Sequence, residues 1–380
     1  MKITGDWLTA AGVQAVLGAL RGAGHQALCV GGCVRNAVLG APVADMDVAT
    51  DAWPETVTDI AEKAGFRVIP TGIDHGTVTV LAMGVSVEVT TFRRDVATDG
   101  RHAVVAFSRD ITDDAARRDF TMNALYVQAD GTVIDPLGGL PDLLARRVRF
   151  VGDADQRIRE DYLRILRFFR FYAHYANPAD GIDAEGLAAC AAHLDGLAAL
   201  SRERVGAELR KLLAAPDPGP AVAAMAQSGV LGAALPGTDA RSLPILLHLE
   251  GDLPPRWQRR LAVLGGDDPT DALRLSRAES ADMGHIRAAI GSDHTLAALG
   301  FLHGEALATD ACLLRAAFTE SLLPDHWRAD AKRGVRAQFP VAAADLMPQL
   351  QGPALGARLN ALQARWLASD LTLTKAELLD

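Results

Sequence analysis

The first 140 residues consist of short β-branched runs that are ended by glycines or polar turns and separated by helix-forming stretches. The expected strands are residues 27–30, 45–50, 77–81, 85–90, 124–127 and 132–135. The expected helices are residues 9–21, 34–39 and 54–64. Short turns between the third and fourth strands and between the last two predict two β-hairpins. This alternation restricts the region to an α/β fold on a small mixed sheet.

The strand pattern ends after residue 140. Residues 162–175 carry apolar side chains at helical spacing, and Ser201 is a candidate N-cap for another helix. Alanine- and leucine-rich stretches interrupted by glycine and proline follow to the C-terminus, with no repeat of fixed period. The remaining 240 residues therefore predict an all-helical region.

The charge balance limits how the chain can bind nucleic acid. Its 380 residues suggest two to three domains and carry a formal net charge of −9. This argues against a broadly basic binding surface but permits a local basic site. Arginine supplies 33 of the 38 basic residues. That bias reflects either a GC-rich genome or arginines that hold phosphates by forked contacts.

The cysteines and the apolar runs indicate the compartment. Cys29, Cys33, Cys190 and Cys312 include no CxxC pair, so we expect buried, reduced residues and no zinc site. The N-terminal residues lack the pattern of a signal peptide, and no apolar run reaches 18 residues. We therefore expect a cytoplasmic protein without a membrane segment.

The run at 27–30 leads into two glycines and an arginine. In Gly31-Gly32-Cys33-Val34-Arg35-Asn36, the glycines precede an expected helix. Glycine lets backbone N–H groups approach a phosphate, and a helix N-terminus favours an anion. Arg35, one turn into the helix, can contact phosphate oxygens. Taken alone, however, two glycines after a strand more often form only a tight turn.

Three carboxylates follow in the chain. Asp45 and Asp47 lie on one face of an expected strand, where they repel each other unless a cation lies between them. Mg²⁺ is the cation that such oxygen ligands favour. Glu88 faces away from Val87 and Val89 on a later strand and can complete a two-metal site. A lone D-x-D is more often a solvated strand end, but the ordered set of features favours nucleotidyl transfer.

Taken together, these motifs resemble the class II tRNA nucleotidyltransferase/poly(A) polymerase family. They are Gly31-Gly32-Cys33-Val34-Arg35-Asn36, Asp45-Met46-Asp47, Val87-Glu88-Val89-Thr90-Thr91-Phe92-Arg93, Asp99-Gly100-Arg101-His102, Arg117-Arg118-Asp119-Phe120-Thr121-Met122-Asn123-Ala124 and Glu160-Asp161-Tyr162-Leu163-Arg164. Asn36 departs from the pattern, because the family usually has aspartate there. The resemblance implies a nucleotidyltransferase head at 1–140, a helical neck at 141–215 that recognises the base, and a helical body and tail at 216–380 that bind tRNA.

The resemblance also implies an activity, addition of C, C and A to the tRNA 3′ end from CTP and ATP with release of pyrophosphate. Asp45 and Asp47 would bind Mg²⁺, and Glu88 would be the third catalytic carboxylate. The implied nucleotide-binding residues are Gly31, Gly32, Arg35, Arg118, Asp119, Asn123, Asp161, Arg164, Arg167 and Arg170. Asp119 and Asn123 share a face if their segment is helical. Residues 93–102 resemble a loop that moves in the family, although the sequence alone indicates an exposed hairpin loop.

Asp161 and Arg164 offer a physical basis for choosing bases. At a spacing of three on one helix they are neighbours, and together they present an acceptor and a donor. Cytosine and adenine each present a donor beside an acceptor on the Watson–Crick edge, which matches this pair. Uracil and guanine present the opposite order and leave the protein groups mispaired. Outside this context, the same pair reads as a surface salt bridge.

Two other functions remain open. A poly(A) polymerase, or an enzyme that adds only CC or only A, uses the same motifs. The last 30 residues have no net charge, which favours tRNA over nonspecific RNA. A non-catalytic RNA-binding protein is disfavoured by the intact carboxylates. Residues 146–170 carry a local charge of +4, so the expected RNA contact is focused rather than diffuse.

Overall fold

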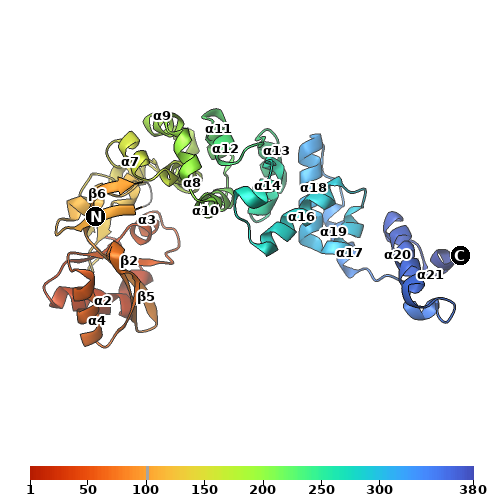
Figure 1. Ribbon diagram of the computed structural model, residues 1–380, viewed down its shortest axis with the longest axis horizontal. Helices are drawn as coiled ribbons and strands as arrows, with labels where there is room; N and C mark the ends of the chain where they lie inside the picture. Colours follow the sequence, from red (N-terminus) through yellow and green to blue (C-terminus); the bar gives the residue numbers. More distant parts are fainter. Residues whose placement is uncertain (100–101) are drawn as a thin grey trace. The chain divides into compact units, whose positions relative to one another are not determined.

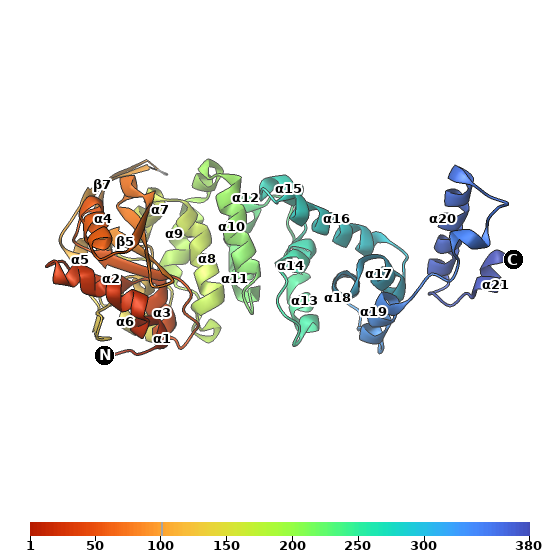
Figure 2. The same cartoon turned by 90° about the horizontal axis from the view of Figure 1, so that it is seen from below.

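The computed structural model describes residues 1–99 and 102–380 (Figures 1 and 2). Their internal contacts divide the chain into two compact units. Unit 1 contains Met1–Ser201 and Ala224–Ala234, and unit 2 contains Arg202–Ala223 and Leu235–Asp380. The expected head and most of the expected neck thus belong to one compact unit.

A seven-stranded mixed sheet forms the centre of the N-terminal region in unit 1, with the order β3-β4-β5-β2-β1-β8-β9. The strands are β1 (Ala27–Val30), β2 (Met46–Thr50), β3 (Arg67–Gly72), β4 (Thr77–Ala82), β5 (Val85–Thr91), β8 (Tyr126–Val127) and β9 (Val133–Ile134). Only β2 and β5 pair in parallel, and the other neighbours are antiparallel. The predicted mixed sheet and both predicted hairpins are confirmed. The edge strand β3 was missed because Pro70 interrupts its pattern.

Two helices cover one face of this sheet. α2 (Ala11–Gly22) and α4 (Pro54–Lys63) pack against each other and against the strands (Figure 1). α2 lies so close that a Cβ on Gly12 would approach the carbonyl oxygen of Ala82 to 2.3 Å and Val85 Cβ to 3.0 Å. Because Val85, Val87 and Val89 alternate with Ser86 and Glu88, this packing turns Glu88 to the opposite face.

The segment expected as a polar loop at 93–102 forms paired strands in its described part. β6 (Arg93–Asp99) and β7 (His102–Phe107) make an antiparallel two-stranded sheet. Gly100 and Arg101 lie outside the described residues. The interpretation as an exposed hairpin therefore fits what is described, and the proposed movement stays a prediction.

Helices pack beside the sheet in the rest of unit 1. The elements are α1 (Asp6–Thr9), α3 (Gly32–Val38), α5 (Ile111–Ala116), α6 (Leu140–Leu144), α7 (Ala154–Glu160), α8 (Leu163–Tyr175), α9 (Ala184–Ala192) and α12 (Val230–Ala234). α8 carries Phe168 and Phe171 into an aromatic cluster with Phe120 and Phe150, with ring centroids 4.8 to 6.3 Å apart. This cluster packs α8 against Phe120, which precedes β8, and against Phe150, which follows β9.

Unit 2 is helical, as predicted: beyond Ile134 the described residues contain no strand. Its longer elements are α10 (Arg202–Leu213), α13 (Leu243–Glu250), α14 (Trp257–Leu264), α16 (Arg277–Gly291), α17 (Leu296–His303), α18 (Glu305–Thr319), α19 (Trp327–Arg336), α20 (Gly352–Ala368) and α21 (Lys375–Leu379). None of the described helices is long and apolar enough to cross a membrane.

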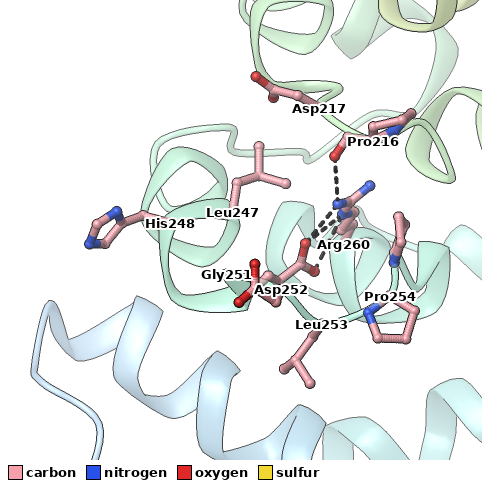
Figure 3. Close-up of a pocket in the computed structure, with 11 residues that line it drawn as sticks. Pro216, Asp217, Leu247, His248, Gly251, Asp252, Leu253, Pro254 and Arg260 are labelled. Atoms are coloured by element: carbon pink, nitrogen blue, oxygen red, sulfur yellow. Dashed lines mark hydrogen bonds and ion pairs between the residues drawn. The ribbon is translucent and has the colours of Figure 1, made fainter.

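A buried arginine organises part of unit 2. Arg260 on α14 donates to the carbonyl oxygens of Leu213, Ala215 and Pro216 at 2.8, 2.5 and 3.1 Å, which follow or end α10. It also pairs with Glu250 at 2.7 Å. Figure 3 shows its hydrogen bond to Pro216. Carbonyl groups at a helix end have no partner within the helix, so Arg260 satisfies groups that would otherwise be buried unpaired.

Candidate active site

Two of the three predicted carboxylates lie opposite each other where β2 pairs with β5, and the third lies just before β2. Asp47 is the second residue of β2, and Asp45 lies just before the strand. The parallel register places Asp47 directly opposite Glu88. Burial, followed by the negative charge of Glu88, raises the pKa of Asp47 to about 6, and Asp45 adds to the shift. Arg118 opposes this shift without cancelling it.

This pattern fits a divalent cation. In the described part of the chain, no three His, Cys, Asp or Glu side chains are grouped closely enough to form a complete metal site. Mg²⁺, however, is usually held by one or two carboxylates, with water and substrate phosphates as its other ligands. Burial is the largest cause of the raised pKa of Asp47, and the nearby carboxylates of Glu88 and Asp45 add to it, so a cation bound there would favour the ionised form. The donor set therefore fits a metal that arrives with a triphosphate.

The backbone of the glycine turn at Gly31 lies close to the side chain of Arg118. Gly31 has a φ of 73°, which favours glycine, and α3 begins at the next residue. A Cβ at Gly31 would lie 3.3 Å from Arg118 Nη1. Arg118 donates to Asp114 at 2.9 Å and to the Tyr126 hydroxyl at 3.2 Å. Although burial opposes it, Arg118 and Arg117 hold the pKa of Asp114 at about 2.

Arg35 has protein partners that the sequence did not indicate. It is only 7% exposed. Its Nε and Nη2 donate to Asn36 Oδ1 at 3.1 and 2.9 Å, its Nη1 to Asn123 Oδ1 at 2.7 Å, and its Nη2 to the Tyr175 hydroxyl at 2.8 Å. Most of its donors are therefore committed within the fold, and its contact with a triphosphate stays a prediction.

Asn123 continues this chain of contacts toward α8. Its amide donates to Asp119 Oδ1 at 2.8 Å, and Arg167 donates to Asp119 Oδ2 at 2.9 Å. Asp119 and Asn123 are therefore in contact, but their segment does not form the helix that would have placed them on one face. Their segment is irregular and ends in a 3₁₀ turn, η2 (Thr121–Asn123). Arg170 lies over the Phe171 ring at 4.7 Å, so the predicted phosphate-binding arginines of α8 flank this network.

The expected geometry of Asp161 and Arg164 is wrong. The two do not share a helix, because Asp161 is extended between α7 and α8, with φ −156°. Its carboxylate accepts from the Leu163 amide at 3.1 Å. Arg164 instead pairs with Glu160 at 2.5 Å and donates to the carbonyl oxygens of Arg157 and Arg117 at 2.9 and 3.1 Å. The roles of Asp161 and Arg164 in binding the nucleotide base remain predictions.

Several site residues escaped the sequence reasoning. Glu160 was detectable, since it lies four residues before Arg164, the spacing of a helical ion pair. Asp114 and Tyr126, which hold Arg118, and Tyr175, which holds Arg35, carry no local signal. Among the predicted residues, the structure joins Arg35, Asn123, Asp119 and Arg167 directly. It couples Asp47 by charge to Glu88, to Arg118 and to Asp45.

Two family models match parts of the chain. Residues 27–149 match the family model described as "Poly A polymerase head domain". Residues 181–241 match "Probable RNA and SrmB- binding site of polymerase A". The human mitochondrial CCA tRNA nucleotidyltransferase 1 is 43% identical over 190 residues, which are 50% of this chain and 44% of that protein. The CCA-adding enzyme of Geobacillus thermodenitrificans is 42% identical over 216 residues, 56% of this chain and 52% of that one. The chain thus spans about half the length of the curated relatives it matches.

Solved structures extend the likeness along the whole chain. The Bacillus stearothermophilus CCA-adding enzyme, crystallised with CTP, is 30% identical and has a TM-score of 0.70. That match covers 94% of this chain and 92% of the other. The Thermotoga maritima CCA-adding enzyme, complexed with tRNA, shares the fold at 18% identity and a TM-score of 0.69, over 96% of this chain and 92% of that one. The chain therefore belongs to the family of CCA-adding tRNA nucleotidyltransferases and bacterial poly(A) polymerases.

Proposed function

We propose that this protein adds C, C and A to the 3′ end of tRNA from CTP and ATP and releases pyrophosphate, by two-metal nucleotidyl transfer. The observation that carries the proposal is the pairing of Asp47 with Glu88 beside Asp45, in a chain of this family. Asp47 and Glu88 are opposite each other on neighbouring strands, and Asp45 lies two residues before Asp47, just outside β2. A cytoplasmic location belongs to the proposal, and the four free, buried cysteines fit a reducing compartment.

Asp45 and Asp47 are the residues that would hold Mg²⁺. When bound, Mg²⁺ would supply positive charge that lowers the pKa of the RNA 3′-hydroxyl and offsets the charge of the triphosphate. Glu88, beside Asp47, would orient the attacking hydroxyl. The Gly31–Gly32 turn, Arg118, Arg167 and Arg170 would hold the phosphates.

The junction of α7 and α8 would read the base. The contacts of Arg164 with Arg157, Glu160 and Arg117 use two Nη1 hydrogens and one Nη2 hydrogen, which leaves Nε–H and one Nη2–H without a partner among the described residues. Two such donors lie along one edge of the guanidinium and can face the acceptor of a cytosine or adenine edge. Asp161, extended at the junction, would accept from the exocyclic amine. Uracil and guanine would mispair with both groups.

The deciding experiment incubates the protein with tRNA that lacks its 3′ CCA, with each nucleoside triphosphate and Mg²⁺, and sequences the products. Addition of C, C and A followed by arrest supports the proposal. Long A tails would instead support a poly(A) polymerase, and addition of only CC or only A a partial enzyme.

The same assay tests the carboxylates. We expect Asp45→Ala and Asp47→Ala to abolish incorporation while circular dichroism stays near that of the wild type and the melting temperature does not fall, because neither change removes a side-chain hydrogen bond or ion pair among the described residues. Asp59→Ala, on the exposed side of α4, is the matched control and should be fully active. Full activity of either site variant would refute the two-metal assignment.

A further inference from the structure

We propose that Tyr175, at the end of α8, is a positioning residue for the nucleotide site: it fixes Arg35 and thereby the Gly31–Gly32 turn. This inference rests on the proposed function, because the turn matters through the nucleotide it binds. Tyr175 belongs to none of the motifs that identify the family, and it lies 140 residues from Arg35 in the chain.

The contact is specific in geometry. The Tyr175 hydroxyl accepts from Arg35 Nη2 at 2.8 Å, and the guanidinium carbon lies 4.1 Å from the centre of the Tyr175 ring. Phe171, one turn earlier, receives the same guanidinium at 5.1 Å. A guanidinium that both stacks on a ring and donates to its hydroxyl is restricted in position and in rotation.

The remaining partners of Arg35 complete this restriction. Its hydrogen bonds go to Asn36, Asn123 and Tyr175, all of which are neutral. Among the described residues, no carboxylate forms an ion pair with Arg35. One Nη1 hydrogen is left over after these bonds, so the buried charge can still be directed at an anion. The three neutral partners therefore fix the orientation of the Arg35 guanidinium without pairing its positive charge with a carboxylate.

Asn36 connects this arrangement to the carboxylates. Its amide nitrogen donates to the carbonyl oxygen of Pro42 at 2.8 Å, in the loop that leads to Asp45. An aspartate, usual in the family at this position, has no hydrogen to donate there. In this chain the hydroxyl of Tyr175 thus acts, through Arg35 and Asn36, on both the glycine turn and the loop before β2.

The position of Tyr175 explains how a neck helix can act on the sheet. Arg164, Arg167, Phe171 and Tyr175 follow one another at spacings of three, four and four, so they lie on one face of α8. Arg167 contacts Asp119, and Phe171 packs on Phe120 at 4.8 Å. The same helix face therefore carries the base-reading arginine at one end and the support of the glycine turn at the other.

The test compares Tyr175→Phe with Tyr172→Phe. The first change keeps the ring and removes only the hydroxyl that Arg35 uses. Tyr172 is the matched control, because it is a buried tyrosine of the same helix whose hydroxyl has no partner among the described residues. Two quantities are measured in the full-length protein: amide hydrogen exchange at residues 31–38, and KM and kcat for CTP and ATP with tRNA.

For Tyr175→Phe we expect exchange at residues 31–38 to be about tenfold faster, and KM for both nucleotides to be about tenfold higher, the effect of one hydrogen bond to a charged group. We expect kcat to change less than twofold, whereas a merely structural role would lower the active fraction and leave KM unchanged. Tyr172→Phe should alter neither quantity.

Unchanged exchange, or unchanged KM, in Tyr175→Phe would overturn the inference, as would an equal effect of Tyr172→Phe. A wild-type protein that incorporates no nucleotide would refute the proposed function instead. Hydrogen exchange would still decide whether Tyr175 fixes the turn.

Discussion

At Asp47, a single partly buried carboxylate lowers the stability of the folded protein at neutral pH. Burial and the neighbouring Glu88 favour its protonated form, and its pKa rises from 3.8 to about 6. The folded state thus binds a proton more tightly than the unfolded chain. The stabilisation from this proton is complete below about pH 4 and is lost as the pH rises through about 6.

We therefore expect Asp47→Asn to stabilise the metal-free protein at pH 7. The gain is at most about 3 kcal/mol, and solvent screening reduces it. Denaturant unfolding from pH 4 to 8 should show the difference from wild type grow between pH 4 and 6 and then level off. Asp59→Asn should show no such dependence. A variant less stable than wild type at pH 7 would contradict the electrostatic argument.

Single residues also show which parts of the site can be predicted from the sequence and which cannot. Asp47 and Glu88 were predictable, since strand periodicity assigns the face and the order of motifs suggests the pairing. The partners of Arg35 were not, because Tyr175 approaches it only after α8 packs against the sheet. A local pattern carries no information on such a contact.

At the scale of elements, the junction between α7 and α8 matters most. The motif at 160–164 predicts a continuous helix, but Asp161 is extended there and accepts from the Leu163 amide at the start of α8. Neither glycine nor proline marks the break, so composition could not reveal it. By contrast, β1, β4, β5 and α4 follow clear patterns and were predictable almost to the residue.

Glu160 is the residue that holds this junction together. It pairs with both Arg157 and Arg164, and its side chain is 11% exposed. We expect Glu160→Gln to loosen Arg164 and to weaken discrimination against UTP and GTP about tenfold, with a similar or larger loss in Asp161→Ala. Single-nucleotide incorporation with each of the four triphosphates measures this.

Glu185→Gln, an exposed position on α9, is the control for charge removal and should keep full selectivity. Discrimination that is unchanged in both Glu160→Gln and Asp161→Ala would place base reading elsewhere in the molecule.

At the scale of the whole molecule, unit 2 contains buried charges within its apolar core. Arg259 and Arg260 are 3% and 2% exposed, and both pair with Glu250. Arg259 also reaches Asp310, whose pKa burial raises to about 6 despite its arginine partners. This network connects α13, α14 and α18 with the end of α10.

Removing one partner of a buried ion pair leaves the charge of the other partner buried and uncompensated. We expect Arg260→Met to destabilise unit 2 by about 3–5 kcal/mol, because Glu250 loses a partner and the carbonyls of Leu213, Ala215 and Pro216 lose their donor. Calorimetry of the full chain measures the effect. Arg241→Ala, in an exposed pair with Asp239, should leave the melting temperature unchanged. A shift for Arg260→Met no larger than that control would show that the network is dispensable.

The parallel pairing of β2 with β5 makes the position of Glu88 beside Asp47 depend on strand register. The chain between these two strands contains α4, β3 and β4, and a slip of one residue in their pairing would turn Glu88 to the helix-covered face. A chain with a misaligned sheet would keep Asp45 and Asp47 but lack the third carboxylate beside them. Under the proposed function, such copies would be inactive and would not extend RNA ends, so catalysis would report on strand alignment.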